Sequence, residues 1–386
     1  MATSTNLRQL LTLALVLFTV ATKSSTCTQS TTRVKAIYYL DNPTFPPSSI
    51  DTSLFTHIFY AFLVPNSITY KLEIQQQQQQ QGSSSKATSL TTFTNTCKTK
   101  PSPITTLISI GGANSNSTLF AFIASDSTAR ATFINSSIEV ARAYGFNGID
   151  FDWEFPQTAK EMNDLGDLFL HWRNAISDEA ISTGKPPLLL TAAVYFSAAL
   201  FLSGEPRTYP VDSINKNLDW INVMSYDLHG AWDNVTGAPS GMFDPETNVS
   251  VVSGLFSWIQ TGLLPEKLVM GMPLYGKTWK LQDPNKHGVG APSVGPGPGV
   301  DGGLAYFQVL DFNKQTGTKV VHDKKTGSVY SYNESYWVGY EDLFTVSIKI
   351  GFAQAVKLRG YFFWVAGLDT SDWEISTQAS KAWKLI

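Results

Sequence analysis

Cysteine is scarce in this sequence, and its scarcity limits how the fold can be held together. Only two cysteines, Cys27 and Cys97, occur in 386 residues. Cys27 lies next to a segment that we expect to be removed, so we expect no structural disulfide and a fold that depends on its hydrophobic core. The two cysteines and the five dispersed histidines form no cluster at the spacing of metal ligands. We therefore expect no metal ion and no other cofactor.

Long apolar runs and an excess of charge of one sign are also absent. No apolar run approaches the roughly 20 residues that span a bilayer. The 28 basic residues nearly balance the 31 acidic ones, which leaves a net charge of −3, and the lysines and arginines are scattered along the chain. This pattern argues against nucleic acid and membranes as partners. With 43% hydrophobic residues the chain can build a large core, and we expect a soluble monomer.

The first 26 residues have the pattern of a secretory signal peptide. Arg8 is followed by a mainly apolar run over residues 10–21 and by small residues up to Ser25, and the run is too short to cross a membrane. Five Asn-X-Ser/Thr sequons support secretion and are candidate N-glycosylation sites: Asn116, Asn135, Asn234, Asn248 and Asn333. We therefore expect a secreted, extracellular protein whose mature chain covers residues 27–386.

Three acids stand at alternate positions within residues 147–156, and the residues between them are apolar. Side chains alternate between the two faces of a strand, so Asp150, Asp152 and Glu154 share one face at intervals of roughly 6 to 7 Å. No lysine or arginine lies among them, so a solvated edge strand explains the pattern poorly. Like charges this close raise the pKa of at least one carboxyl, which keeps a general acid protonated at neutral pH. The stretch predicts a catalytic carboxylate cluster.

Apolar runs of strand length recur along the chain with helical patterns between them. The acidic strand, expected to reach Glu154, is the fourth of eight, and the others are residues 34–40, 57–63, 104–110, 188–194, 220–227, 267–275 and 360–365. Helices are expected over residues 127–144, 158–181, 250–261, 345–358 and 375–384. Residues 75–85, mostly glutamine and serine, are expected to form a surface loop. This alternation predicts an α/β fold, a (β/α)8 TIM barrel with its active site at the C-terminal ends of the strands.

The interval between the seventh strand and its helix is too long for a barrel loop. It holds about 70 residues, whereas a βα loop usually has ~2 to 6. Strand-like runs lie within it at residues 304–307, 320–322 and 328–332, so we expect a small α+β insertion domain over residues 277–344. Residues 297–302 match the G-x-G-x-x-G spacing, but no strand precedes and no helix follows, which excludes a dinucleotide site.

The acidic stretch resembles the catalytic signature D-x-x-D-x-D-x-E of the family 18 glycoside hydrolases, the chitinases. Further similarities to that family are the sequence from Ser109 to Gly112, the sequence from Met224 to Asp227, and Trp364. Residues 53–62, 188–195 and 218–227 are similar to plant class V chitinases, and residues 205–210, 269–279 and 360–369 are similar to the legume Nod factor hydrolases of that class. The resemblance covers essentially the whole chain beyond the signal peptide.

The resemblance implies a retaining mechanism in which the substrate's own 2-acetamido group is the nucleophile. Glu154 would protonate the glycosidic oxygen and Asp152 would orient the acetamido N–H, while Asp150 would share a proton with Asp152. Tyr226 would donate its hydroxyl to the acetamido oxygen. The same resemblance assigns substrate binding to Trp364 beneath the sugar and to Met224, Asp227, Tyr38 and Phe62. Judged by residue type alone, Met224 and Trp364 also fit an ordinary core, and Ser109 with its two following glycines fits tight packing.

The sequence departs from the family signature at its first position, where Asn147 replaces the usual Asp. Asn147 lies at an odd offset from Asp150, so it does not share the face of the acids. We expect it to be a supporting residue that tunes pKa values and leaves activity intact.

Two function classes follow from the resemblance. The first is a secreted, endo-acting hydrolase of β-1,4-linked N-acetylglucosamine oligomers, either chitin or lipochitooligosaccharides, acting in the plant apoplast. The alternative is a lectin or receptor that binds chitin oligosaccharides on the same barrel without cutting them. The intact Asp152, Glu154 and Tyr226 favour the hydrolase. No sequence feature supports a further alternative, an inhibitor of other glycosidases.

Overall fold

The computed structural model describes residues 33–74, 85–100, 104–201 and 205–384. The signal peptide expected over residues 1–26 and most of the glutamine-rich segment lie outside these ranges, so their predictions stay untested. In the described part of the chain, no helix is long and apolar enough to cross a membrane. No group of three or more His, Cys, Asp or Glu side chains in those same residues is placed to hold a metal ion.

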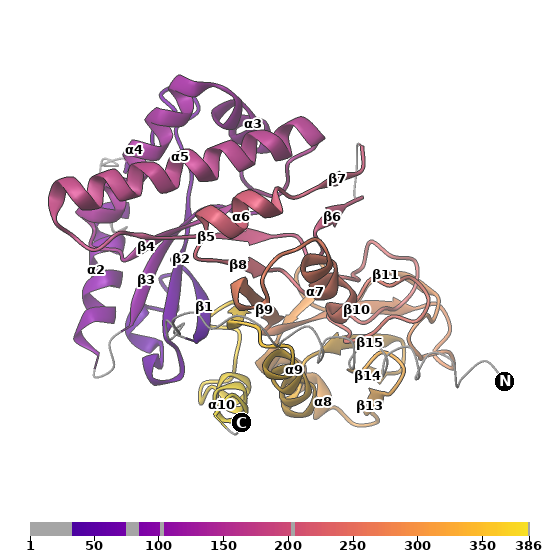
Figure 1. Ribbon diagram of the computed structural model, residues 1–386. Coiled ribbons are helices and arrows are strands. Elements are labelled where there is room, and N and C mark those ends of the chain that lie inside the picture. The colour runs from indigo at the N-terminus through magenta and orange to yellow at the C-terminus, as the bar shows by residue number, and fades with distance from the viewer. Residues whose placement is uncertain (1–32, 75–84, 101–103, 202–204, 385–386) are drawn as a thin grey trace. The chain divides into compact units, whose positions relative to one another are not determined.

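Eight parallel strands close into a barrel, as the sequence predicts (Figure 1). Closure occurs where β16 pairs with β1, with Gly360 opposite Val34. In chain order the barrel strands are β1 (Val34–Leu40), β2 (His57–Leu63), β3 (Thr105–Gly111), β4 (Gly148–Asp152), β5 (Leu189–Val194), β8 (Trp220–Val223), β9 (Leu268–Pro273) and β16 (Gly360–Trp364). The (β/α)8 prediction is therefore confirmed.

Helices surround the barrel, and most begin at a side-chain cap. The helices outside the insertion domain are α2 (Lys86–Thr99), α3 (Ser117–Ser125), α4 (Ser127–Ala143), α5 (Ala159–Thr183), α6 (Val211–Asn217), α7 (Val251–Gln260), α9 (Leu343–Ala355) and α10 (Glu374–Ala382). At the start of α5, the Thr158 hydroxyl accepts a hydrogen bond from the Glu161 N–H at 3.1 Å. The helix ends at Gly184, whose φ of 66° is left-handed.

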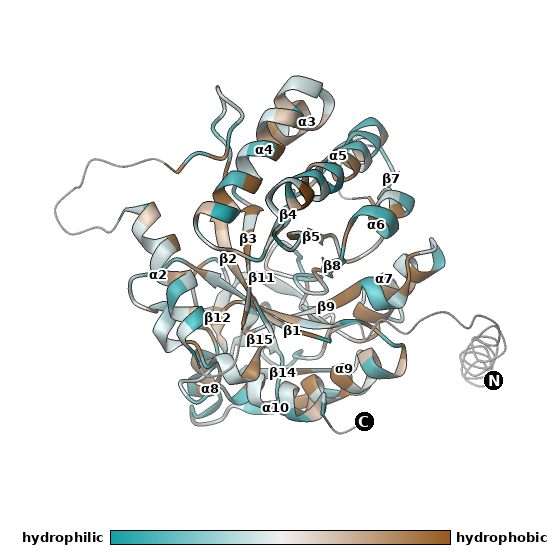
Figure 2. Ribbon diagram, turned by 60° about the vertical axis from the view of Figure 1, so that its left-hand side comes forward, coloured by the Kyte–Doolittle hydropathy of each residue, from teal (hydrophilic) through white to brown (hydrophobic). Residues whose placement is uncertain are grey.

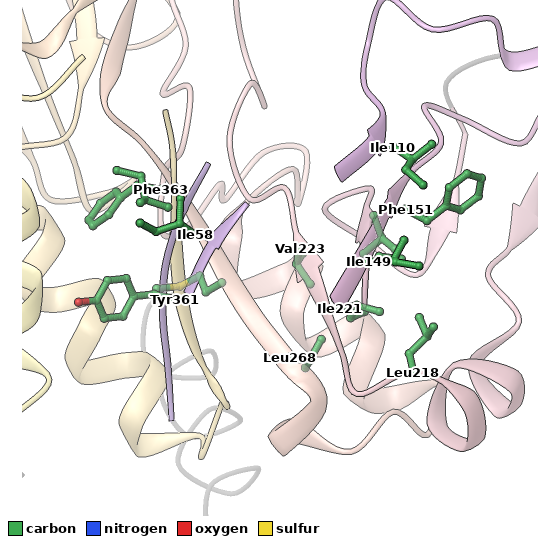
Figure 3. Packing of buried hydrophobic residues seen from close by; sticks show 14 of the residues in the cluster. Ile58, Ile110, Ile149, Phe151, Leu218, Ile221, Val223, Leu268, Tyr361 and Phe363 are labelled. Carbon is green, nitrogen blue, oxygen red and sulfur yellow. The ribbon is translucent and has the colours of Figure 1, made fainter. Parts of the chain in front are cut away.

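The alternation of side chains along β4 divides the core into two layers. Ile149 and Phe151 point out of the barrel toward the helices, where Phe151 meets Phe120 and Trp172 edge-on at 5.0 and 5.5 Å between ring centres (Figure 3). Figure 2 shows the hydrophobic colour on the barrel strands and mixed colour along surrounding helices such as α5. Because successive residues of a strand alternate, Asp150 and Asp152 point into the barrel.

The long interval after β9 forms a second sheet, which confirms the expected insertion domain. It contains β10 (Tyr275–Leu281), β11 (Ser293–Pro296), β12 (Gly303–Ala305), α8 (Tyr306–Asn313), β13 (Lys319–Asp323), β14 (Ser328–Asn333) and β15 (Tyr336–Tyr340). The strand order is β11-β10-β15-β14-β13, with β12 paired to β10.

Two details of the insertion domain bear on its sequence predictions. The strand expected over residues 304–307 is wrong in its second half, because α8 begins at Tyr306, where the Gln308 side chain accepts a hydrogen bond from the Ala305 N–H at 2.9 Å. The expectation that no strand precedes residues 297–302 is wrong, because β11 ends at Pro296. These residues lead into another strand, β12, and not into a helix, so they differ from the strand-to-helix turn of a dinucleotide site.

Candidate active site

A cavity of about 630 Å³ lies at the C-terminal ends of the barrel strands. Eight of the nine residues predicted for catalysis or substrate binding line it, namely Tyr38, Phe62, Asp152, Glu154, Met224, Tyr226, Asp227 and Trp364. The ninth, Asp150, lies deeper in the barrel, two residues before Asp152 on the same face of β4. The residues come from β1, β2, β4, β8 and β16 or the loops that follow them, so barrel closure brings them together.

Two strands that carry site residues are shorter than predicted. β4 ends at Asp152 and β8 at Val223, so Glu154 and the sequence from Met224 to Asp227 belong to the loops that follow. Trp153 turns out of the barrel, where its indole N–H donates to the Ser117 hydroxyl at 2.7 Å. Beyond β8, Asp227 takes a left-handed conformation with φ of 53°. These turns leave Glu154 half-buried at the cavity wall instead of inside the barrel.

Asp150 is completely buried and accepts four hydrogen bonds. Its Oδ2 accepts from Tyr38 Oη and Ser109 Oγ, both at 2.8 Å, and its Oδ1 accepts from Thr191 Oγ1 at 2.6 Å and Asn222 Nδ2 at 3.2 Å. Burial raises the pKa of Asp150, and the donors act against that rise. The net pKa of Asp150 is still raised, but the donors limit the rise because each of them favours the charged form.

Three of these donors are functional residues that the sequence did not assign. Ser109 was interpreted as a packing residue, and Thr191 and Asn222 were not singled out. The Trp220 indole N–H donates to Asn222 Oδ1 at 3.0 Å, which fixes the amide with its nitrogen toward Asp150. A polar residue within an otherwise apolar strand is the signal that could have identified them.

Asp152 and Glu154 are poised to hold protons at neutral pH. Burial, followed by the charges of Glu154 and Asp150, raises the pKa of Asp152 well above its usual range. Burial and the charge of Asp227 raise the pKa of Glu154 to about 7, and a hydrogen bond with Asp152 acts in the opposite direction. The pKa of Asp152 is raised further than that of Asp150, whose four donors counteract burial, so a proton shared by the pair favours Asp152.

Asp227 and Tyr226 line the cavity together with Tyr275 from the start of β10. Asp227 Oδ1 accepts a hydrogen bond from Tyr275 Oη at 2.8 Å and lies 3.1 Å from Lys277 Nζ. Burial and the nearby charges, Asp152 first among them, raise the pKa of Tyr226 well above its usual range, so its phenol is a neutral donor. Tyr275 and Lys277 were not assigned from the sequence, although their position after the seventh strand places them at the catalytic end of the barrel.

Trp364 lines the cavity from the end of β16. Its ring stacks on Phe62 with 5.6 Å between ring centres and an interplanar angle of 22°, and it lies 5.4 Å from the Tyr38 ring. Trp364 and Met224 are only half-buried and both line the cavity, so neither is an ordinary core residue. An indole with one free face suits a sugar ring.

Asn147 lies at the opposite end of β4 from the cavity. Its Oδ1 accepts hydrogen bonds from Thr106 N at 3.0 Å and Thr106 Oγ1 at 3.3 Å, which ties β4 to β3. This contact is structural and involves none of the three acids.

The predicted glycosylation sites differ in accessibility. Asn116, Asn135, Asn234 and Asn248 are exposed, whereas Asn333 is half-buried and its Nδ2 donates to Gln315 Oε1 at 3.4 Å. Attachment of a glycan at these sites stays a prediction.

Proteins of known family share both this sequence and this geometry. Residues 29–369 match the family described as "Glycosyl hydrolases family 18". Over 355 residues the chain is 74% identical to Nod factor hydrolase protein 1 of Medicago truncatula, covering 92% of this chain and 91% of that relative. It is 68% identical over 387 residues to class V chitinase CHIT5b of the same species, covering 100% of both chains.

A solved structure of a chitinase also matches this chain. The crystal structure of a family 18 chitinase from Cycas revoluta in complex with (GlcNAc)3 matches with a TM-score of 0.84 at 40% identity. The match covers 91% of this chain and 99% of that chain.

Proposed function

The chain belongs to the glycosyl hydrolases family 18, and from that premise we propose that it cleaves the β-1,4 linkages of N-acetylglucosamine oligomers with Glu154 as general acid. The observation that carries this proposal is the half-buried Glu154 at the cavity wall, whose pKa is raised to about 7 by burial and by Asp227. A carboxyl with that pKa still holds a proton at neutral pH and gives it up readily.

The neighbours of Glu154 support a substrate-assisted mechanism. Glu154 protonates the glycosidic oxygen while the substrate's acetamido oxygen bonds to the anomeric carbon, and the leaving sugar departs as an oxazolinium ion forms. Asp152 Oδ1 has no hydrogen-bond partner among the described residues, so it is available to accept the acetamido N–H. The neutral Tyr226 phenol donates to the acetamido oxygen. Glu154, now ionised, then takes a proton from the water that opens the oxazolinium ion.

The same observations support hydrolysis over sugar binding alone. The relatives are named as hydrolases, and the proton donor, the acetamide-orienting Asp152 and the phenol of Tyr226 all line one cavity. A lectin on this barrel would need neither a carboxyl with a raised pKa nor a saturated carboxylate beneath it.

Hydrolysis of chitopentaose tests this proposal. We expect the wild-type protein to release shorter oligomers and Glu154→Gln to bind the pentamer without cutting it. The matched control is Glu139→Gln on the exposed face of α4, which should behave as wild type. Wild-type protein that binds the pentamer and leaves it intact over long incubation would contradict the proposal and favour the lectin.

A second candidate substrate is a lipochitooligosaccharide, and the side of the cavity formed by the loops after β5 and β8 favours it. Phe196, Leu228 and Val249 line this side, and Trp232 beside them is 63% exposed. Covering such a surface with an acyl chain stabilises a complex by about 0.8 kcal/mol per buried methylene. The 74% identity to a protein named Nod factor hydrolase agrees with this candidate.

One comparison of turnover distinguishes between the two candidate substrates. An acylated tetramer and its de-acylated counterpart of equal length should differ, with the acylated molecule cut faster and with a lower KM. Trp232→Ala should remove most of that preference. Equal rates on the two molecules would limit the function to plain chitin oligomers.

We also propose that the protein is secreted. The N-terminal pattern over residues 1–26 and the exposure of four of the five sequons support this. N-terminal sequencing of protein recovered from the extracellular medium should start between residues 22 and 27. Retention of the intact N-terminus inside the cell would contradict secretion.

A further inference from the structure

We propose that Lys277 is a positioning residue for the hydrolytic reaction, whose ammonium group holds the Asp227 carboxylate and the Trp232 indole together at the cavity wall. Lys277 Nζ lies 3.1 Å from Asp227 Oδ1 and 5.3 Å from the centre of the Trp232 ring. It also lies 5.2 Å from the centre of the Tyr275 ring. The proposal rests on the proposed function, because Asp227 and Trp232 matter only if sugar is bound and cut there.

The three groups differ in how firmly the chain holds them. Lys277 belongs to β10, where it pairs with Gly303 of β12 on one side and Gly339 of β15 on the other. Its side chain is only 17% exposed, so the surrounding residues hold its ammonium group in place. Asp227 and Trp232, by contrast, belong to the loop after β8 and are more exposed, the Asp227 side chain at 42% and Trp232 at 63%. The insertion domain therefore supplies a rigid cation to which a barrel loop is attached.

The position of Trp232 depends on the ammonium group of Lys277 and on Gly230, which has no side chain to occupy the space of the ring. A Cβ added at Gly230 would come within 2.3 Å of the Trp232 ring, so the indole lies directly across that glycine. A cation over an indole is attractive, more strongly so when the pair is desolvated. Lys277 thus selects one orientation of an otherwise exposed ring at the rim where substrate enters.

The charge of Lys277 also reaches the acid through Asp227. The ionisable groups that interact with Glu154 are Asp152 of β4, Tyr209 directly after β7 (Arg207–Thr208), Tyr226 and Asp227 after β8, and Tyr275 at the start of β10. Arg207 lies close to Tyr209. Arg207 donates to the carbonyl oxygens of Pro156 and Glu205. Lys277 Nζ forms an ion pair with the carboxylate of Asp227. Within the Trp232 loop, His229 is paired with Asp233 at 3.0 Å and lies 3.7 Å from Asp244.

Loss of the ammonium group therefore has two separable consequences. The uncompensated charge of Asp227 would keep the proton on Glu154 to higher pH, because Asp227 is the neighbouring charge that raises the pKa of Glu154. The alkaline limb of the kcat profile should move upward by about 0.5 pH unit. A loosened Trp232 should raise KM by about 3- to 10-fold, the range of one lost cation–π contact.

The test compares Lys277→Met and Lys277→Arg with Lys280→Met, a control at an exposed position of the same strand. For each protein, kcat and KM on chitopentaose are measured from pH 5 to 9. Lys277→Met should show both effects. Lys277→Arg should have the alkaline limb of its kcat profile at the wild-type pH and a KM close to that of wild type. Lys280→Met should match wild type. In an Asp227→Asn background, Lys277→Met should no longer move the limb.

Two outcomes would overturn the proposal. One is a Lys277→Met profile and KM that match those of Lys280→Met, and the other is a limb shift that persists unchanged with Asp227→Asn. A separate measurement distinguishes failure of the proposed function. In a Glu154→Gln background, Lys277→Met should still weaken binding of chitopentaose by the same factor, whether or not the parent protein cuts it. Far-UV circular dichroism of each variant identifies any protein that has failed to fold.

Discussion

Asp150 and Glu154 are carboxyl groups four residues apart with opposite requirements. Four donors around Asp150 favour its charged form and limit the rise of its pKa, whereas Glu154 has few donors and a neighbouring negative charge, so it holds its proton to about pH 7. The difference arises from position. Asp150 points into the polar interior of the barrel, and Glu154 follows the end of the strand at the cavity wall.

The raised pKa of Glu154 makes a prediction about stability. A carboxyl whose pKa is higher in the folded than in the unfolded state favours the fold fully only below its unfolded pKa, and this contribution is lost as pH rises through about 7. Glu154→Gln should therefore raise the free energy of unfolding at pH 8 by about 1 to 3 kcal/mol. At pH 4 the variant and wild type should be equally stable. Urea unfolding at the two pH values measures this, and an equal gain at both would contradict it.

Asp150→Asn tests whether the four donors require a charge. An amide in place of the carboxylate would direct an NH2 group at two of the donors, which leaves buried polar groups unpaired at a cost of about 1 to 3 kcal/mol. We expect a lower Tm together with a fall in kcat, because the negative charge beside Asp152 is lost. Ser109→Ala, which removes one donor and leaves the carboxylate, should lower Tm and kcat by less. Unchanged Tm and kcat in Asp150→Asn would argue against an ionised Asp150.

At the scale of elements, a buried ion pair joins three parts of the chain. Lys349 of α9 contacts Glu341, which follows β15, and the carbonyl oxygen of Ser240 in the loop after β8. Ser240 Oγ also donates to Glu341. The two charged side chains are 1% and 3% exposed, so neither charge can be solvated by water. The pair anchors the loop that carries Asp227 and Trp232 to the insertion domain.

Removing one partner of this pair should be strongly destabilising. Lys349→Met leaves Glu341 buried and unpaired, which typically costs about 3 to 5 kcal/mol. The double variant Lys349→Met/Glu341→Gln should recover a large part of that loss, because no charge is then buried. Lys314→Met, which breaks an exposed pair with Asp311, is the matched control and should change stability by less than about 1 kcal/mol. Chemical unfolding measures all three, and no recovery in the double variant would contradict the account.

The sequence predicted elements best where one local pattern decides them. The strands at residues 34–40 and 57–63 were predicted with the bounds of β1 and β2, because dense apolar and aromatic runs end at turn residues. Helix α5 was predicted over residues 158–181, and it begins at the Thr158 cap. Helices α2 and α3 were missed because α2 is rich in Ser and Thr and α3 is apolar nearly all round, so neither shows a clear amphipathic face.

Only the site residues that belong to a recognisable motif were predicted from the sequence. The acidic stretch identified Asp150, Asp152 and Glu154, and the resemblance to family 18 added Tyr226 and Trp364. Three of the four donors to Asp150, together with Tyr275 and Lys277, were not assigned, since they reach the site from other strands. Distances between strands depend on barrel closure, which no local pattern encodes.

At the scale of the whole molecule, the barrel and its insertion share one site. The barrel supplies Glu154, the proposed acid, together with Asp150, Asp152 and Trp364, while β10 of the insertion supplies Tyr275 and Lys277. The insertion therefore completes the wall of the cavity, and both parts of the α/β fold position side chains around it.

The central claim is that the substrate's acetamido group, with Glu154 as acid, carries out a retaining cleavage. The most direct test is the anomeric configuration of the new reducing ends, recorded by proton NMR in the first minutes of chitopentaose cleavage. Retention gives the β-anomer first, followed by slow mutarotation, and this is the result that we predict. Initial release of the α-anomer would show inversion and would contradict the mechanism.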